Sequence, residues 1–161
     1  MRRFGDWPRP GVRHRIRPGA YGVVVRGGEV LLALNESPGE EVALPGGGID
    51  PGESPLQALH REALEETGWR IRPLRRVGAY RRFTYMPEYG FHAEKICHVW
   101  LCAAVRRVAE PTEPDHRPVW AAAEMAAAAL SIEGERALFA EAMRLAHGYS
   151  AAAPRLAVSA A

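Results

Sequence analysis

Apolar and polar positions follow one another in blocks along the chain, and most of the apolar blocks are short enough to be strands. Two apolar runs in AYGVVVRGGEVLLALN, residues 20–35, flank Gly27 and Gly28, which is typical of a β-hairpin. The run AEKICHVWLCAAVRRV, residues 93–108, predicts a long buried strand. Further strands are predicted from VALPGG, IRPLRRVGAYRRFTY and RPVWA, and helical segments from residues 121–130 and 133–147.

The clearest helix is predicted for SPLQALHREALEETG, residues 54–68. Ser54 suits the N-cap, Pro55 suits the first helical position, and Gln57 completes a capping box. Gly68 suits the left-handed conformation that ends many helices. Both ends of this helix are therefore predicted from local chemistry alone.

The order of the elements predicts a layered α/β domain, because strands precede and follow a central helix and another helix comes last. Residues 1–18 are rich in Pro, Gly and Arg and are predicted to form an irregular arm. Residues 19–148 form the predicted domain, and residues 149–161 form a low-complexity tail that is predicted to be flexible. A length of 161 residues fits one domain with its own core.

Composition restricts the function less than the motifs do. The net charge of +2 gives no argument for a nucleic acid or a membrane as partner. Neither a membrane helix nor a signal peptide is expected, since no long apolar run is present. Cys97 and Cys102 fall on opposite faces of one predicted strand, which predicts two buried thiols and no disulfide between them. A cytoplasmic protein is therefore expected.

The predicted helix carries like charges beside its apolar stripe. The stripe consists of Leu56, Leu59 and Ala63, and the acids next to it are Glu62, Glu65 and Glu66. A pair of glutamates at i, i+4 costs about 0.2–0.5 kcal/mol even on an exposed helix. A solvated acidic face is one interpretation of this pattern. A site for a divalent cation is the other, because the glycines at 46–48 place flexible backbone just before these oxygen ligands.

The spacing of the glycine loop and the acids resembles the signature of the Nudix hydrolases, the MutT-like pyrophosphohydrolases. In that signature a glycine, five residues, a glutamate and seven residues precede Arg-Glu-U-x-Glu-Glu-x-Gly-U, where U is bulky and aliphatic. All the fixed positions match, at Gly47, Glu53, Arg61, Glu62, Glu65, Glu66 and Gly68. At the U positions, Ala63 is smaller than usual and Trp69 is aromatic. The resemblance implies an α/β/α sandwich, with a mixed sheet between the catalytic helix and a C-terminal helix.

The resemblance also implies metal-dependent hydrolysis of a nucleoside diphosphate linked to another group X, with Mg²⁺ or Mn²⁺ as cofactor. Glu62 and Glu66, one helical turn apart, are expected to bind the metal. Glu65 is expected to bind it as well or to orient water. The family further suggests a backbone carbonyl ligand from Gly46 or Gly47.

Other residues are expected to support this site. Arg61 and Glu53 can pair and tie the glycine loop to the helix. A general base from outside the motif is expected at Glu113, before the last strand, or at Glu94, at the start of the long strand. An ordinary surface carboxylate is the alternative interpretation of either residue.

The segment RRFTYMPEYGF is the candidate for binding the substrate. Arg81 and Arg82 could hold phosphates, and Tyr85 and Tyr89 could stack on a base. A hairpin tip with incidental charge explains the same pattern, and the group X stays open.

Three kinds of function remain after these steps. A small nucleotide is the expected partner, a nucleic acid is not expected, and a homodimer stays open. The alternatives to a pyrophosphohydrolase of small nucleotides are a catalytically silent Nudix-fold sensor or regulator and an RNA 5′-end pyrophosphohydrolase. The intact set of carboxylates favours an enzyme over a silent binding module.

Overall fold

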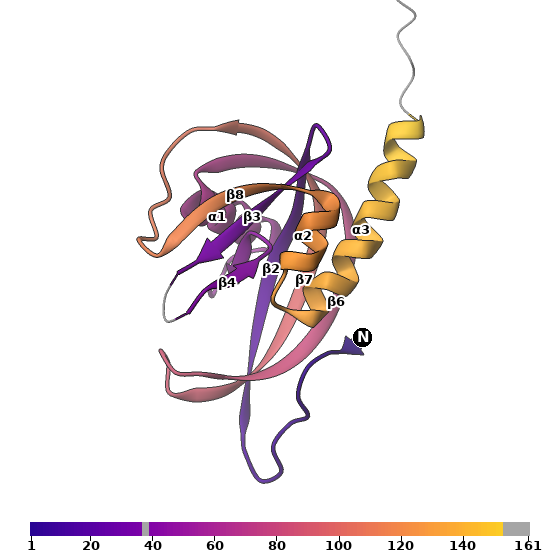
Figure 1. Ribbon diagram of the computed structural model, residues 1–161. Helices are drawn as coiled ribbons and strands as arrows, with labels where there is room; N and C mark the ends of the chain where they lie inside the picture. Colours follow the sequence, from indigo (N-terminus) through magenta and orange to yellow (C-terminus); the bar gives the residue numbers. More distant parts are fainter. Residues whose placement is uncertain (37–38, 153–161) are drawn as a thin grey trace, which may run out of the picture.

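The computed structural model describes residues 1–36 and 39–152 and shows a mixed β-sheet with helices on both faces (Figure 1). The strands are β1 (Arg2–Arg3), β2 (His14–Arg26), β3 (Glu29–Asn35), β4 (Glu41–Ala43), β5 (Gly46–Gly48), β6 (Trp69–Met86), β7 (Phe91–Arg107) and β8 (His116–Ala122). The helices are α1 (Pro55–Thr67), α2 (Ala123–Ala129) and α3 (Glu133–Ala152). The predicted α/β/α arrangement is confirmed, because α1 covers one face of the sheet and α2 and α3 cover the other.

The sheet has the order β1-β6-β7-β2-β3-β4, with β5 paired to β2 and β8 paired to β3. β2 and β7 run parallel whereas β6 and β7 run antiparallel, so the sheet is mixed. β2 and β3 form the predicted hairpin, and Gly27 and Gly28 at its turn have φ values of 57° and 85°. Glycine adopts these two positive φ values without the steric cost that other residues would meet.

Neighbouring residues of the buried strands pack into two different hydrophobic cores. Leu32 and Cys97 belong to the core beneath α2 and α3. Leu31 and Cys102 belong to the core beneath α1. The two thiols are free and lie on opposite faces of the sheet, as the sequence predicts.

The ends of α1 also agree with the sequence. The Ser54 hydroxyl accepts from the backbone N–H of Gln57 at 3.3 Å, and the Gln57 side chain accepts from the backbone N–H of Ser54 at 2.8 Å. Gly68 ends the helix with a φ of 72°. The predicted apolar stripe is wrong at Leu56, which is 42% exposed, whereas Ala58 is buried.

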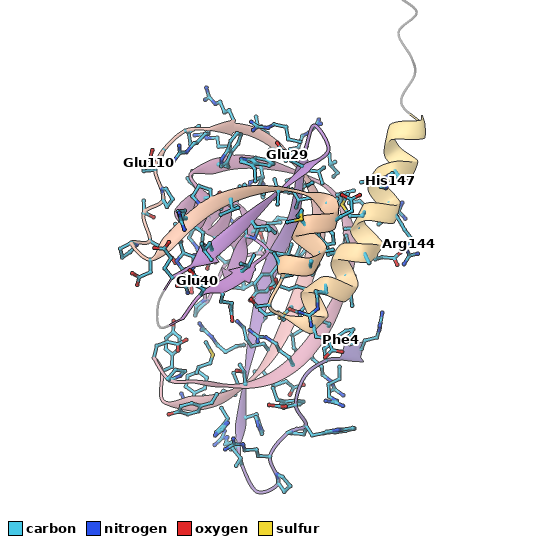
Figure 2. All side chains as sticks on the ribbon, in the orientation of Figure 1. Phe4, Glu29, Glu40, Glu110, Arg144 and His147 are labelled. Atoms are coloured by element: carbon cyan, nitrogen blue, oxygen red, sulfur yellow. The ribbon has the colours of Figure 1, made fainter. Side chains whose placement is uncertain are left out.

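The first residues contain more regular structure than the sequence suggests. β1 pairs in parallel with β6, and β2 begins at His14, which lies beside His92 of β7. The hydrophobic pattern does not predict these strands, because the first residues of β2 are partly or fully exposed. Backbone pairing with neighbouring strands holds them in place instead. Figure 2 places Phe4 near the start of α3, and its ring packs edge-on against Tyr80 at a centroid distance of 5.8 Å.

At the other end of the chain, α3 continues past the boundary expected at residue 148 and reaches Ala152. The rest of the predicted tail, residues 153–161, lies outside the described residues. Across the two described ranges, no helix is both long enough and apolar enough to cross a membrane.

Candidate active site

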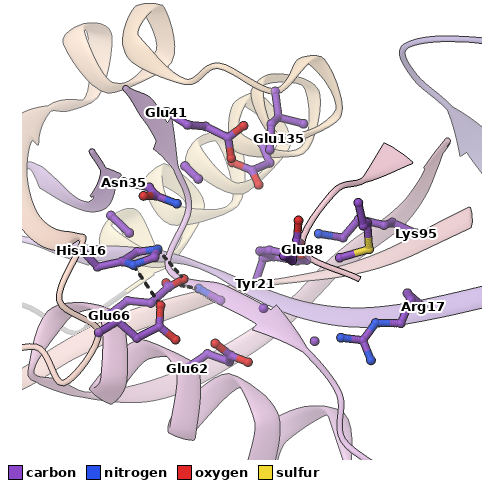
Figure 3. Close-up of a pocket in the computed structure, with 18 of the residues that line it drawn as sticks. Arg17, Tyr21, Asn35, Glu41, Glu62, Glu66, Glu88, Lys95, His116 and Glu135 are labelled. Carbon is purple, nitrogen blue, oxygen red and sulfur yellow. Dashed lines mark hydrogen bonds and ion pairs between the residues drawn. The ribbon is translucent and has the colours of Figure 1, made fainter. Parts of the chain in front are cut away.

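A cavity of about 420 Å³ is lined by α1 and by the first turn of α3. Residues of β2, β6 and β7, the segment from β3 to β5 and the loop before β8 complete its walls. This volume lies in the range of small-molecule sites. Figure 3 shows Glu62 and Glu66 of α1 on one side of the cavity and Glu135 of α3 on another.

Two glutamates of α1 face the cavity from partly or fully buried positions. Glu66 is buried, and its Oε2 accepts a hydrogen bond from the backbone N–H of Gly46 at 2.9 Å. Burial raises the pKa of Glu66 well above its ordinary value, against the hydrogen bond from Gly46 and with the help of nearby Glu62. Burial also raises the pKa of Glu62, against the effect of Arg61. Negative charge at these positions is therefore costly until a cation compensates it.

Arg61 ties the glycine loop to α1. Its guanidinium donates to both carboxylate oxygens of Glu53, at 2.7 and 2.9 Å, and to the carbonyl oxygen of Gly48 at 2.9 Å. The same group donates to Glu62 at 2.8 Å and to Glu65 at 3.0 Å. The hydrogen bond from Arg61 lowers the pKa of Glu53 to about 2. The structure thus pairs Arg61 with Glu53 as expected. The same guanidinium also binds Glu62 and Glu65 of α1.

Two glycines of the loop lie too close to other atoms for a larger residue. Gly46 has a φ of 143°, and a Cβ there would collide with the backbone of β2. A Cβ on Gly47 would lie 2.5 Å from the carboxylate carbon of Glu62. The Gly47 carbonyl oxygen, an expected metal ligand, lies 2.8 Å from the position of a Cβ on Gly19 in β2. This carbonyl oxygen therefore lies close to β2, and the backbone ligand expected from Gly46 or Gly47 stays a prediction.

The loop before β8 and the first residue of β8 add two ligand groups to the acids of α1. Oε2 of Glu113 lies 2.9 Å from Nδ1 of His116, and Nε2 of the same ring lies 3.6 Å from Oε1 of Glu66. The backbone N–H of Thr112 donates to the carbonyl oxygen of Glu65 at 2.8 Å and so fastens the loop to α1. Sequence analysis names Glu113 but misses His116, because no spacing rule shows that this loop folds against the helix.

The acids and the histidine form two overlapping groups of ligand atoms. One group joins Glu113 to Glu66 and His116, the other joins it to Glu62 and Glu65, and within each group the atoms lie within 4.8 Å. Carboxylate oxygens at such spacing suit Mg²⁺ and Mn²⁺. Burial raises the pKa values of Glu62 and Glu66, so a bound cation would favour their charged forms. The site therefore fits divalent cations.

The four residues expected to bind substrate divide between two sides of the hairpin formed by β6 and β7. Arg82 and Tyr89 line the cavity. Arg81 points to the other side, because neighbours along a strand alternate, and it pairs with Glu94 at 3.4 Å. Tyr85 packs on a histidine of β7 outside the cavity. The structure thus places Arg81 and Tyr85 outside this cavity, and Glu94, the other candidate base, pairs with Arg81 and does not line the cavity.

Several polar residues of the cavity carry no sequence motif. They are Arg17, Tyr21, Asn35, Glu41, Lys95 and Glu135 (Figure 3). They come from β2, β3, β4, β7 and α3, and only the pairing of the strands and the packing of α3 make them neighbours. No spacing along the chain could have identified them.

Comparisons with known proteins agree with this geometry. The family model described as NUDIX domain matches residues 15–142. Over 83 residues the chain is 42% identical to the NAD-capped RNA hydrolase NudC of Pseudomonas syringae pv. syringae, a match that covers 50% of this chain and 30% of that protein. Over 24 residues it is 75% identical to the RNA pyrophosphohydrolase of Helicobacter pylori, covering 15% of this chain and 16% of that protein. The matches thus span less than half the length of these curated relatives.

Solved structures share the fold. A NUDIX hydrolase from Nitrosomonas europaea superposes with a TM-score of 0.67 at 20% identity, covering 81% of this chain and 90% of that one. Identity this low supports the fold but not a shared substrate. The family model, in contrast, covers most of the sequence and includes the glycine loop, α1 and β8. The chain belongs to the Nudix family.

Proposed function

We propose that the chain hydrolyses the phosphoanhydride bond of a nucleoside diphosphate linked to another group X. The observation that carries this proposal is the pair of overlapping ligand groups that meet at Glu113 within a cavity of nucleotide size. The relatives described above are hydrolases by name, which supports the same class of reaction. The part of the cavity formed by Glu62, Glu65, Glu66, Glu113 and His116 is called the acidic end below.

The residues of the acidic end divide into three roles. Glu62, Glu65 and Glu66 would hold Mg²⁺ or Mn²⁺. Such cations polarise the phosphoanhydride, lower the pKa of water and offset negative charge on the leaving phosphate. Glu113 would accept the proton of the attacking water, and His116 at 2.9 Å would orient its carboxylate. Arg61 holds the carboxylates of α1 at fixed spacing.

The finer properties of the protein stay predictions. Mg²⁺ is the expected cation because the ligand set is dominated by carboxylate oxygens. A cytoplasmic location is expected from two buried thiols that are not joined to each other. A small nucleotide is the expected partner, and a homodimer stays open.

The test is a panel of nucleoside diphosphate derivatives incubated with Mg²⁺ or Mn²⁺ and scored by release of phosphate or phosphomonoesters. We expect the parent protein to cleave at least one compound, and Glu66→Gln to lose about a thousandfold in rate. The amide can still accept from the N–H of Gly46, so the variant is expected to fold. Glu124→Gln, at an exposed position of α2, is the matched control and should keep the parent rate.

Two results would contradict the proposal. A Glu66→Gln protein that turns over as fast as the parent would refute the assignment of the acidic end. A parent protein that binds nucleotides but cleaves no member of the panel would support the alternative of a silent sensor or regulator.

A further inference from the structure

Glu135, in the first turn of α3, is a buried carboxyl with one unused oxygen. Its exposed fraction is 0%, and its Oε2 accepts a hydrogen bond from the backbone N–H of Leu44 at 2.8 Å. In the described part of the chain, its Oε1 has no hydrogen-bond partner. The residue lines the cavity, on a different side from Glu66 (Figure 3). Buried polar atoms are nearly always hydrogen-bonded, so we expect Oε1 to receive a donor from a ligand.

Arg82 of β6 brings a complementary group to the same cavity. Its Nε is also buried and, among the residues described, has no hydrogen-bond partner. Burial raises the pKa of Glu135, and the positive charge of Arg82 opposes this rise, so the two groups lie within electrostatic reach. Glu135 and Arg82 therefore offer an acceptor and a donor to one ligand; we call them the polar end of the cavity.

The acidic end and the polar end of the cavity suit different parts of one ligand. If the acidic end holds the diphosphate, as the proposed function requires, the rest of the nucleotide extends from it within the same cavity. A second phosphate would suit Arg82 but would meet the negative charge of Glu135. A purely apolar group would leave both polar atoms without a partner, which is costly in a buried site. A neutral group with neighbouring donors and acceptors satisfies both residues.

We propose that Glu135 and Arg82 recognise the base of the nucleotide and that they favour guanine. Guanine carries two adjacent N–H donors, at N1 and N2, beside the acceptor O6. A carboxylate oxygen has lone pairs for both donors, and a guanidinium can donate to O6. Adenine and cytosine offer only an amino group as donor on this edge, and uracil only a ring N–H. Guanine therefore forms more hydrogen bonds with this pair than any other common base.

The test measures binding separately from hydrolysis. Nucleoside monophosphates have no phosphoanhydride bond, so the dissociation constants of GMP, IMP, AMP and UMP can be measured by calorimetry without turnover. The buffer is held at pH 8, since the pKa of Glu135 is raised to about 7 and the carboxyl must be ionised. We expect GMP to bind at least about tenfold tighter than AMP or UMP, and IMP, which lacks the N2 amino group, to fall between.

Glu135→Gln is the decisive variant. The amide oxygen can still accept from Leu44, but the amide nitrogen turns the free acceptor into a donor. We expect this change to weaken GMP binding at least about tenfold and UMP binding much less. Glu133→Gln removes the same charge from an exposed position in the same helical turn and is expected to leave all four constants unchanged.

The outcomes separate this inference from the proposed function. Equal affinity of the parent for GMP, AMP and UMP, including undetectable binding of all three, overturns the inference even if Glu135→Gln cannot be purified in folded form. A folded Glu135→Gln protein with unchanged affinities overturns it as well. Guanine preference in binding without cleavage of any diphosphate would leave this inference standing and refute the proposed function instead.

Discussion

The acidic end and the polar end of the cavity differ in the charges that they carry and in the ligands that these charges suit. At the acidic end, Arg61 holds Glu53, Glu62 and Glu65, yet the pKa values of Glu62 and Glu66 stay raised, chiefly because burial disfavours the charged carboxylates. At the polar end, Glu135 and Arg82 have opposite charges, and each has a buried atom without a hydrogen-bond partner among residues 1–36 and 39–152. The first arrangement calls for cations, and the second calls for a neutral ligand with both donors and acceptors.

The two ends of one cavity can therefore bind two parts of a substrate through different interactions. The acidic end is held rigidly by protein hydrogen bonds, so its geometry should depend on Arg61 and on the glycines below it. At the polar end, Glu135 accepts one hydrogen bond from Leu44, but its other oxygen and the Nε of Arg82 have no partner in the described part of the chain, so these residues should respond to pH and to the ligand.

The largest effect is expected from Arg61→Met. Removal of the guanidinium leaves Glu53, Glu62 and Glu65 without their shared donor, so the carboxylates should spread apart. We expect kcat/KM to fall about a thousandfold and the free energy of unfolding to fall by about 2 kcal/mol. Steady-state kinetics and urea unfolding measure the two quantities.

The control for this change is Arg107→Met, which removes an arginine paired with a glutamate at the surface. Surface pairs contribute little, so both quantities should stay near the parent values. Equal losses in the two variants would mean that Arg61 has no special place in the acidic end.

A smaller effect is expected from pH at the polar end. Burial raises the pKa of Glu135 to about 7, so between pH 4.5 and 7 the folded protein binds a proton that the unfolded chain releases. The contribution of this group to stability is therefore fully present below pH 4.5 and is lost as the pH rises through 7. Relative to Glu135→Gln, the parent should lose about 3 kcal/mol between pH 4 and pH 8.

Urea unfolding of both proteins across this range measures the difference. Glu133→Gln is again the control, because it removes an exposed carboxyl from the same helical turn. If the difference in unfolding free energy between Glu135→Gln and the parent did not change with pH, the polar end would not disfavour the negative charge of this carboxyl.

A third test concerns Gly47, which lies against the Glu62 carboxylate of the acidic end. The atoms nearest to the Cβ of Gly47→Ala are those of the Glu62 carboxylate, which would be pushed from its position beside Arg61. We expect a loss of about tenfold to thirtyfold in kcat/KM with little change in unfolding free energy. Gly39→Ala, where a Cβ meets open space, is the control and should change neither quantity. A normal rate in Gly47→Ala would mean that the position of Glu62 is not critical.

The smallest effect separates two exposed tyrosines of the same hairpin. Tyr89, 56% exposed, lines the cavity, whereas Tyr85, 52% exposed, does not. Tyr89→Ala should raise KM about fivefold through lost contact with the substrate, and Tyr85→Ala should leave it unchanged. If Tyr85→Ala had the larger effect, the substrate would have to lie on the opposite side of the hairpin.

Much of the fold follows from local pattern. The capping of α1, the hairpin at Gly27 and Gly28 and the two separate thiols are all present where the sequence predicts them. The arm predicted for the first 18 residues instead contains strands, because its polar residues pair through the backbone and leave no hydrophobic pattern. Leu56 is exposed although the helical wheel places it in the stripe, since the wheel does not say how far the neighbouring sheet extends.

Most of the acidic end could be predicted from the sequence, because the residues from Gly46 to Glu66 occupy one continuous segment that ends in one helix. Helical periodicity places their carboxylates on one side at a fixed spacing, whatever the rest of the chain does. Only the tertiary structure brings His116 to the acids of α1 and places Arg81, Tyr85 and Glu94 outside the cavity lining.

The polar end belongs to the tertiary structure altogether. Glu135 and Arg82 are far apart in the sequence, and they meet only because β6 lies in the sheet that α3 covers. The unused oxygen of Glu135 exists because α3 packs its first turn against the backbone of Leu44. Pattern and spacing along a chain describe neighbours on one element, whereas contacts between elements depend on strand pairing and packing, which no local rule contains.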